Sequence, residues 1–413
     1  MASLVLGMDF YEKEVYVGLW DEEERFTKSF TVPARSDGER IPLFVVPLSD
    51  GSCVAGLEGV RKSLADDIEG TSALYGKKAA DKTVLNGREY DTTELLAGFL
   101  EDVLNGIRKC FAGAAFSRIC ITGEEMNADD ERRLSNALRM LGYDNDRFFI
   151  INHANAFLMY IINTDELRRR QHVVGVDISA DRIEAYYFNP ADRTRNYPAY
   201  IERLETSRTL KVGLAGIEDR RMRAEAFENI ISFVLMQNRN LNCMYVTGKT
   251  AEDDCIKNVL RKYASPGLKI FSGQNLYSSG ACYRAVNEKP RDNILSDGEV
   301  FHSVSVEGYR DATVEFVPLI EAGCPLVGAK KKIFMIPDNI NNIVFRIRDY
   351  RNGHTEAVNF SLYGLISGEN KTNRLEISVR FVDIKTLVIK VRDLGFGEIK
   401  PATFRVSEQT IML

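Results

Sequence analysis

The sequence predicts two structural parts: an α/β region built from two similar halves, and an all-β region behind it. The first observation is an internal repeat, because residues 5–20 align without a gap on residues 173–188. The second is a series of short segments beyond residue 300 that alternate apolar and polar residues. The third is the length of 413 residues, which is enough for two or three packed cores.

Each repeat opens with an apolar strand that ends at an aspartate. Residues 5–9 run on to Trp20, and residues 173–177 run on to Phe188, with a polar turn inside each segment. Two strands around a tight turn are typical of a β-hairpin. We therefore predict two equivalent hairpins, with Asp9 and Asp177 at matching positions.

The order of elements behind each hairpin is also repeated. Residues 119–123 predict a strand that ends in Thr-Gly, and a helix follows with Asn127 as its N-cap and Gly142 as its stop. Residues 245–248 repeat the strand and its Thr-Gly, again before a helix. Each half then adds a short strand and another helix. Chance reuse of common α/β pieces is the alternative, but the ungapped match and the shared order favour a duplication.

An insertion separates the first hairpin from its Thr-Gly strand. It contains an apolar segment at 41–46 and a long amphipathic helix whose apolar residues recur every three or four positions. The apolar positions are Leu95, Leu96, Phe99, Leu100, Val103, Leu104 and Ile107. The second half has a shorter stretch in this place, mainly a helix near 222–237.

Composition and charge narrow the class of protein. The chain is 45% hydrophobic and 27% charged, as in ordinary globular proteins. Its net charge of −5 argues against broad binding of nucleic acid or of anionic membranes, although a local basic patch can hide within that total. Apolar runs are too short for membrane insertion, and we expect no signal peptide. Seven scattered cysteines without a CxxC pair predict reduced thiols and a cytoplasmic location.

Signatures of catalysis and of metal binding are missing from the sequence. Residues 247–250 read Thr-Gly-Lys-Thr, but a Walker motif needs glycine at the position of Cys243. The four histidines have no HxxxH or HExxH spacing, and no G-x-S-x-G nucleophile motif occurs. We therefore expect no catalytic residue and no metal site.

Two related halves, each opening with an aspartate-tipped hairpin, resemble the superfamily of actin, sugar kinases and heat-shock ATPases. Several segments resemble DnaK-type heat-shock chaperones in particular. Residues 41–51 resemble an early chaperone strand and turn, residues 150–160 resemble the segment that contains I-I-N-E-P, and residues 278–282 resemble the A-Y-G-A-A segment. Farther along, residues 316–320, 332–334 and 338–347 resemble the first strands of the chaperone substrate domain.

The resemblance implies an actin-like, duplicated two-lobe nucleotide-domain fold over residues 1–288, followed by a β-sandwich. Lobe I would span about 1–170 and lobe II about 171–288, with a linker at 289–299. The sandwich would occupy 300–413, without the helical lid of the chaperones, and Asn352-Gly353 predicts one of its hairpin turns.

The resemblance also implies a nucleotide site with altered chemistry. Asp9 and Asp177 match two metal-linked acids, Glu184 falls where a further acid is expected, and Gly248 and Gly280 match adenosine-side glycines. Turns that cradle phosphates need small residues, because backbone N–H groups must approach the oxygens closely. Here the two tips, residues 10–14 and 178–182, contain no glycine and carry acidic side chains that repel a triphosphate.

Each of these residues also has a purely structural explanation. An aspartate that ends a strand can accept N–H bonds from its turn, and glycines can be needed for tight packing. Lys13 and Arg182 suggest that internal salt bridges fill the cleft, since buried carboxylates need cationic partners when no metal is present. The Glu-Pro of the chaperone family is replaced by His153-Ala154.

The C-terminal part would bind an extended peptide in the manner of the chaperone sandwich. Phe334, Ile336 and Val344 fall near the matching positions, although alternation along strands also allows these side chains to face the core.

These observations together predict a chaperone-like module that binds proteins or peptides on a degenerate, non-hydrolysing ATPase frame, with no cofactor and no nucleic acid. The alternative is a divergent chaperone that still binds Mg-ATP and hydrolyses it slowly. A small-molecule kinase of the same superfamily is disfavoured by the predicted sandwich.

Overall fold

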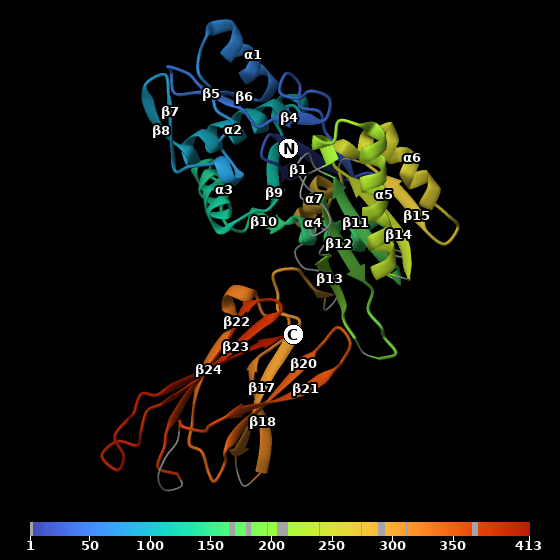
Figure 1. The fold of residues 1–413 in the computed structure, drawn as a ribbon. Coiled ribbons are helices and arrows are strands. Elements are labelled where there is room, and N and C mark those ends of the chain that lie inside the picture. The colour runs from blue at the N-terminus through green and yellow to red at the C-terminus, as the bar shows by residue number, and fades with distance from the viewer. Residues whose placement is uncertain are drawn as a thin grey trace. The chain divides into compact units, whose positions relative to one another are not determined.

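The computed structural model describes residues 3–164, 170–178, 183–195, 197–204, 214–238, 240–273, 275–287, 294–310, 313–365 and 371–413. It has a mixed α/β architecture and divides into two units (Figure 1). The first unit comprises Met1–Asn189 and Glu202–Arg291, and the second comprises Pro190–Ile201 and Asp292–Leu413. Of the predicted linker at 289–299, residues 289–293 lie outside the described part of the chain.

The first sheet of the N-terminal unit has the strand order β10-β9-β1-β2-β3. β1 pairs with β2 in antiparallel fashion and with β9 in parallel, and β9 pairs in parallel with β10. The strands are β1 (Ser3–Phe10), β2 (Glu14–Asp21), β3 (Phe26–Ser29), β9 (Ala115–Gly123) and β10 (Phe148–Asn152), with β4 (Arg40–Pro42) beside β2. The hairpin predicted at 5–20 is confirmed.

The second sheet repeats this order as β15-β14-β11-β12-β13, with the same pairing directions among its first four strands. Its strands are β11 (His172–Ile178), β12 (Ile183–Asn189), β13 (Ala199–Leu204), β14 (Leu241–Thr247) and β15 (Lys269–Ser272). The register also matches, because Asp9 pairs with Thr122 and Asp177 pairs with Thr247. The register shift that follows Leu4 in β1 also has its equivalent after His172 in β11.

Two helices cross over between these sheets. α4 (His153–Thr164) follows the first sheet, yet its Phe157 ring packs on Gly175 of the second, where an added Cβ would lie 2.9 Å from the ring. α7 (Leu276–Val286) follows the second sheet, yet it packs on Gly7 of the first, where a Cβ would lie 2.1 Å from the Ser278 carbonyl oxygen. Each helix therefore covers the sheet of the other half.

The predicted insertion is built around a long helix whose buried side chains share one core with the first sheet. α2 (Thr92–Cys110) buries all seven of the predicted apolar residues. Around it lie α1 (Gly56–Asp66), β5 (Val45–Pro47), β6 (Cys53–Ala55), β7 (Lys82–Leu85) and β8 (Arg88–Asp91).

The remaining helices are α3 (Ala128–Met140), α5 (Arg220–Gln237) and α6 (Asp254–Tyr263). The predicted cap and stop of α3 are both confirmed, with Asn127 in a capping box and Gly142 at a φ of 81°.

The second unit contains two four-stranded antiparallel sheets, in the orders β18-β17-β20-β21 and β19-β22-β23-β24. Their bounds are β17 (His302–Arg310), β18 (Thr313–Ile320), β19 (Lys330–Met335), β20 (Asn342–Asp349), β21 (Thr355–Ser361), β22 (Leu375–Asp383), β23 (Thr386–Asp393) and β24 (Val406–Met412). Alternate side chains of both sheets share one core, for example Phe345 from one and Ile377 from the other. A short strand, β16 (Ile294–Leu295), pairs with Ala199 and Tyr200 in the same unit.

Within the described ranges, none of the helices combines the length and the apolar character that crossing a bilayer requires.

Candidate functional site

The two aspartates of the repeat are both buried at the ends of their strands. Asp9 is the penultimate residue of β1 and pairs with Tyr16 of β2, and Asp177 is the penultimate residue of β11 and pairs with Glu184 of β12. Asp9 is 0% exposed and Asp177 is 2% exposed. Because an ionised carboxylate is costly to bury alone, each aspartate needs a partner inside the unit.

His153 is the residue that lies between the two aspartates. It is the first residue of α4, and its Nε2 lies 2.7 Å from Oδ1 of Asp9. On the other side of the ring, Nδ1 lies 4.0 Å from Oδ2 of Asp177. The imidazole, itself 2% exposed, thus occupies the space between the ends of the two equivalent strands.

Two tyrosines complete the cluster around His153. Tyr11, at the tip of the first hairpin, donates its hydroxyl to Oδ2 of Asp177 at 3.1 Å. Tyr277 of α7 stacks on the imidazole, with 3.9 Å between ring centroids and 4° between ring planes. A side chain from the first hairpin therefore reaches the aspartate of the second half, and both rings are buried.

The charges in this cluster depend strongly on burial. Burial alone would lower the pKa of His153, but the neighbouring Asp9 carboxylate raises that pKa to about 9. Burial raises the pKa of Asp177 to about 8, although the nearby His153 opposes this shift. Burial and the Asp177 carboxyl also hold the pKa values of Tyr11 and Tyr277 well above the ordinary value for tyrosine. The raised pKa of His153 favours an imidazolium beside Asp9 at neutral pH, and Asp177 accepts its hydrogen bond from Tyr11.

Several buried polar atoms in the described part of the chain have no hydrogen-bond partner. They include Asp9 Oδ2, His153 Nδ1, Asp177 Oδ1 and the hydroxyl oxygen of Tyr277. Thr122 and Thr247 are the strand-pairing partners of Asp9 and Asp177. Their hydroxyl oxygens also have no hydrogen-bond partner. Such groups cost free energy and are rare in native cores, so their concentration marks this cluster as a candidate functional site.

Glu184 has a partner of its own. Its carboxylate accepts a hydrogen bond from Tyr186 at 2.8 Å and forms an ion pair with Arg203. Arg203 also lies 3.9 Å from the Glu125 carboxylate. The predicted acid is therefore present and buried, but it is already neutralised by an arginine of the same unit.

The predicted glycines serve close packing. An added Cβ on Gly248, whose φ is 93°, would lie 2.5 Å from the Ile178 carbonyl oxygen and 2.6 Å from Oδ1 of Asp177. A Cβ on Gly280 would lie 1.9 Å from the carbonyl oxygen of Ala156. Both glycines are explained by backbone contacts within the fold.

The prediction that Lys13 fills the cleft is wrong. Its side chain is exposed, and among the described residues the partner of Asp9 is His153. The tip turns Tyr11 inward instead, because the aromatic ring is cheaper to bury than an ammonium group. Arg182, the second predicted cleft-filling cation, lies outside the described residues.

The residues that do fill the cleft have only an indirect signal in the sequence. The signal for His153 is the replacement of Glu-Pro at the start of a helix, which does not by itself indicate a role. Tyr11 and Tyr277 carried no signal, because their inward orientation depends on the packing of both halves. In the described ranges, His, Cys, Asp and Glu side chains do not form a group of three that could hold a metal ion.

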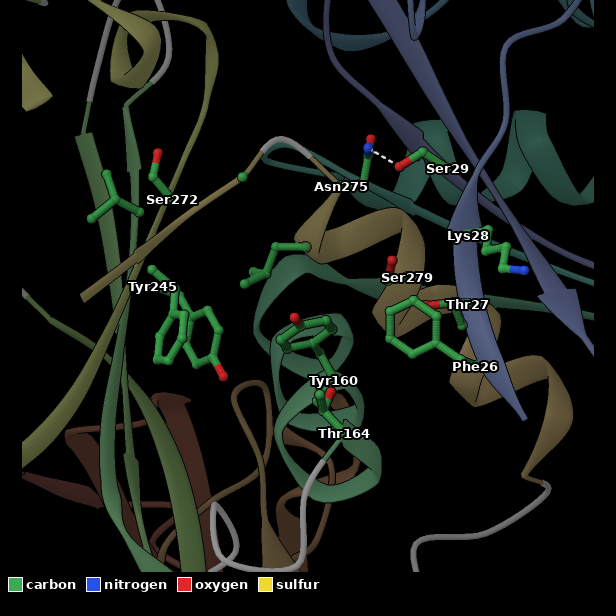
Figure 2. Close-up of a pocket in the computed structure, with 14 residues that line it drawn as sticks. Phe26, Thr27, Lys28, Ser29, Tyr160, Thr164, Tyr245, Ser272, Asn275 and Ser279 are labelled. Carbon is green, nitrogen blue, oxygen red and sulfur yellow. Dashed lines mark hydrogen bonds between the residues drawn. The ribbon is translucent and has the colours of Figure 1, made fainter. Parts of the chain in front are cut away.

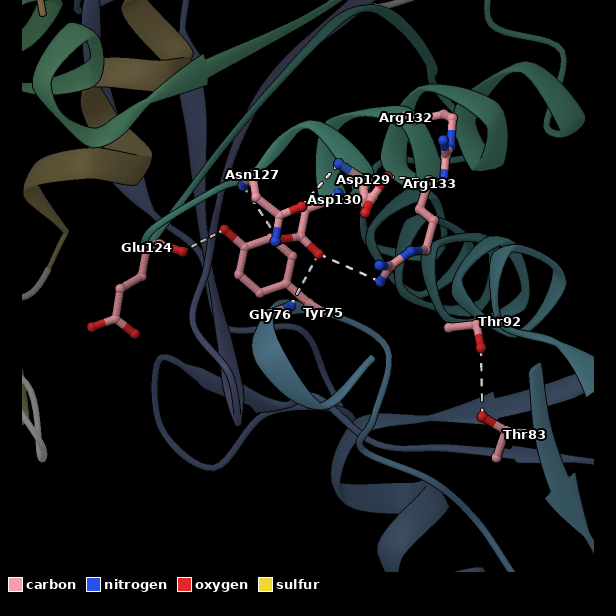
Figure 3. Close-up of polar contacts among 10 residues, drawn as sticks. All are labelled: Tyr75, Gly76, Thr83, Thr92, Glu124, Asn127, Asp129, Asp130, Arg132 and Arg133. Carbon is pink, nitrogen blue, oxygen red and sulfur yellow. Dashed lines mark hydrogen bonds and ion pairs between the residues drawn. The ribbon is translucent and has the colours of Figure 1, made fainter. Parts of the chain in front are cut away.

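The insertion supports the strand end beside this cluster (Figure 3). Tyr75 donates its hydroxyl to the carbonyl oxygen of Glu124 at 2.7 Å, directly after β9. A short turn away, Asp130 accepts hydrogen bonds from the Gly76 backbone at 3.1 Å and from Arg133 at 3.4 Å. These contacts fix the loop between β9 and α3, and with it the position of Thr122.

A separate cavity of about 700 Å³ lies elsewhere in the first unit (Figure 2). Its walls come from β3, the end of α4, β14, β15 and the start of α7. Tyr245 and Phe271 stack at 5.2 Å between ring centroids, and Tyr160 meets Tyr245 edge-on at 5.4 Å. Hydroxyl groups line the remainder, among them Thr27, Ser29 and Ser279. The volume falls in the range of small-ligand pockets, but charged groups that would define a ligand are sparse.

The three predicted peptide-binding residues do not share one surface. Phe334 and Ile336 are 52% and 49% exposed, and Phe334 points outward from the sheet of β19 because its neighbours Ile333 and Met335 pack on the core. Val344 lies on the outer face of the other sheet, because Ile343 and Phe345 are buried. The structure brings Phe334 and Ile336 together and places Val344 apart from them.

Exposed large apolar residues gather at one end of the second unit. This end holds the β17–β18 turn and the connections β19–β20, β21–β22 and β23–β24. The residues are Tyr309, Val314, Phe334, Ile336, Tyr363, Ile399 and Phe404, each at least 49% exposed. We call this set the apolar end. Arg405 ties two of its loops together by donating to the Gly364 carbonyl oxygen at 3.1 Å.

Two family models match the chain. The model described as the C-terminal part of a family of unknown function, DUF5716, matches residues 28–296. A second model, described as a domain of unknown function, DUF8552, matches residues 299–413. No curated protein matches the chain.

Proposed function

The chain belongs to the DUF5716 family of unknown function, so its role is argued from its own residues, and we propose a non-hydrolysing, protein-binding module. In this proposal the first unit is a degenerate ATPase-type frame that resembles the DnaK-type chaperones. The second unit captures a protein or an extended peptide. We place the module in the cytoplasm, where its seven free cysteines would stay reduced.

The equivalent sheets of the first unit support the proposed frame. Strand order, pairing direction and register repeat around Asp9 and Asp177, which favours a duplicated, actin-like fold. In the second unit, two antiparallel sheets with a common core favour a β-sandwich of the kind that follows the chaperone nucleotide domain.

The observation that carries the proposal is the filled space between Asp9 and Asp177. In a working ATPase of this class, a metal and the phosphates of the nucleotide would need that space. Here the His153 imidazole occupies that space, with its Nε2 2.7 Å from Oδ1 of Asp9. The Tyr11 hydroxyl donates a hydrogen bond to Asp177. A nucleotide would have to displace buried rings and separate a buried ion pair, which leaves at least one charge without compensation.

Thermal denaturation with and without millimolar Mg-ATP tests this part of the proposal. A ligand at one hundred times its dissociation constant stabilises the folded state by about 2.7 kcal/mol, which is a readily measured shift in Tm. We expect an unchanged Tm. The competing hypothesis of a slow ATPase is motivated by the retained Asp9 and Asp177, and it expects a rise in Tm that Asp177→Asn abolishes. That result would overturn the non-hydrolysing proposal.

The apolar end supports the binding part of the proposal, because clusters of exposed apolar side chains mark interaction sites. A peptide-array screen of the full chain tests it. We expect Phe334→Arg to reduce peptide capture at least tenfold. Val382→Arg is the matched control, because Val382 is 51% exposed near the opposite end of β22. Val344→Arg measures whether the outer face of the other sheet takes part. Capture that is equal in the wild type and Phe334→Arg would remove the apolar end from the proposal.

A further inference from the structure

The outer face of the sheet β19-β22-β23-β24 is strongly basic. Along these strands, the residues that alternate with the buried core positions point away from the core. Five of the exposed side chains on these strands are cationic, and the exposed Arg374 directly before β22 adds a sixth: Lys330, Lys332, Arg374, Arg380, Lys390 and Arg392. We call this set the basic face. Its sign is opposite to the net charge of −5 of the whole chain.

Strand pairing brings these cations close to one another. Lys330 pairs with Arg380 across β19 and β22. Lys332 and Lys390 both pair with Ser378, one from each side of β22. Neighbouring strands lie about 4.8 Å apart, so these side chains form a continuous field of positive charge.

Carboxylates neutralise only part of this field. Glu376 lies 3.2 Å from Lys332 and pairs across the strands with Arg392. Glu408 pairs across the strands with Lys390. Asp383, exposed at the end of β22, pairs with Thr386 on the same face. These three are the acidic side chains at outward positions within the four strands, all of which the structure describes. Six cations thus face three carboxylates, and the remaining positive charge calls for an anionic partner.

We propose that the basic face binds an acidic, extended segment of a partner protein. This inference rests on the proposed protein-binding function and names the chemistry of the partner. Alternate residues of a strand are about 6.7 Å apart, which is the spacing between Lys330 and Lys332 and between Lys390 and Arg392. Alternate carboxylates of an extended acidic segment have the same spacing and match these pairs.

The same observations favour a peptide over a nucleic acid. Single-stranded nucleic acids bind through aromatic platforms on which bases stack. The exposed aromatic ring on the strands of this face is Phe334, and the Arg374 guanidinium already covers it at 4.5 Å from the ring centroid. Glu376 and Glu408 would repel a continuous phosphate backbone, whereas a peptide can place neutral or basic side chains opposite them.

The basic face adjoins the apolar end through Phe334, which belongs to β19 together with Lys330 and Lys332. A bound segment that carries both acidic and apolar residues therefore contacts both surfaces. Electrostatic attraction sets the rate and the specificity of such binding, while the apolar end supplies buried area.

Fluorescence anisotropy with the full chain tests the proposal, using fluorescein-labelled deca-glutamate as the probe. We expect binding that weakens at least tenfold between 50 and about 300 mM salt, because exposed charges are screened over about 8–10 Å at physiological salt. The variant Lys390→Glu with Arg392→Glu should weaken binding at least tenfold. The matched control, Arg346→Glu with Arg348→Glu, changes the charge equally on the outer face of the other sheet, and it should weaken binding less than threefold.

Three results would overturn the inference: equal losses in the two double variants, tighter binding of a twenty-nucleotide oligo-dT, or tighter binding of vesicles rich in phosphatidylserine. An uncharged, leucine-rich heptapeptide separates this inference from the proposed function. If the heptapeptide binds and deca-glutamate does not, only the acidic partner is ruled out. If neither probe binds, the protein-binding function fails as well. Thermal denaturation of both double variants confirms that each is folded.

Discussion

Gly280 of α7 lies directly against the carbonyl oxygen of Ala156 in α4, and a Cβ at this glycine would be 1.9 Å from that oxygen. We expect Gly280→Ala to lower the free energy of unfolding by about 1–3 kcal/mol, because backbone atoms of one helix must move. Chemical denaturation measures the loss. Gly273→Ala is the control, since a Cβ there meets nothing within 4 Å and should change stability little. Equal effects of the two substitutions would show that the helix contact is not tight.

The stability of the fold should fall as the pH rises above 6.5. The pKa of His153 is raised from its ordinary 6.5 to about 9 in the folded state, so the folded protein holds this proton more tightly than the unfolded chain. The contribution of His153 is therefore complete below pH 6.5 and is lost as the pH rises through 9. The contribution of His153 is on the order of 3 kcal/mol. The raised pKa of Asp177, about 8 against an ordinary 3.8, also makes stability fall with rising pH, but its contribution changes between pH 3.8 and 8.

His153→Gln isolates the histidine in this pH dependence. The substitution keeps a hydrogen-bonding side chain of similar size but removes the titrating group. We expect the variant to be less stable at pH 6 and to lose less stability between pH 6.5 and 9 than the wild type. A variant whose stability follows the wild-type pH profile would assign the dependence to another group.

Tyr11→Phe tests the contact between the first hairpin tip and the second half. The substitution keeps the buried ring but removes the hydroxyl that donates to Asp177 at 3.1 Å. Because it leaves a buried carboxyl oxygen without this donor, we expect a loss of about 1–3 kcal/mol in denaturant titrations. Tyr16→Phe removes a hydroxyl that donates to the less buried Glu14 and should cost less. An equal cost for both would contradict a special role of Tyr11.

Asn127→Ala should destabilise the fold through the start of α3. The Asn127 side chain accepts from the backbone N–H groups of Asp129 and Asp130, and the Asp130 carboxylate accepts from the Asn127 backbone N–H. Removal of such a cap costs about 1 kcal/mol. Asn136→Ala, on the exposed side of the same helix, serves as the comparison in thermal denaturation. A neutral Asn127→Ala would indicate that the contacts of Tyr75 and Asp130 hold the loop without the cap.

Much of the first unit was predictable because its signals are local or repeated. The two hairpins, the Thr-Gly strand ends and the apolar stripe of α2 each depend on periodicity within a short segment, and each is confirmed. The equivalence of Asp9 and Asp177 was predictable for the same reason, since an ungapped alignment implies a common register.

The contents of the cleft were not predictable from local patterns. His153 reaches Asp9 across 144 positions of the sequence, and Tyr11 reaches Asp177 across 166 positions. Whether Lys13 or Tyr11 turns inward at a hairpin tip depends on the burial offered by the other half. Val344 is a different case, because alternation along a strand does not tell which set of residues faces the core. In the structure Ile343 faces the core, and Val344 therefore faces outward.

The crossing of α4 and α7 has a consequence for biosynthesis. The face of the first sheet that bears Gly7 stays uncovered until α7 emerges near the end of the first unit, although its own strands are made early. Neither half could be cut out as an independent fragment, since each would expose the surface that the helix of its twin normally shields. A truncated first half would therefore tend to self-associate. In the full chain, both halves must be synthesised before the exposed sheet face of either half is covered.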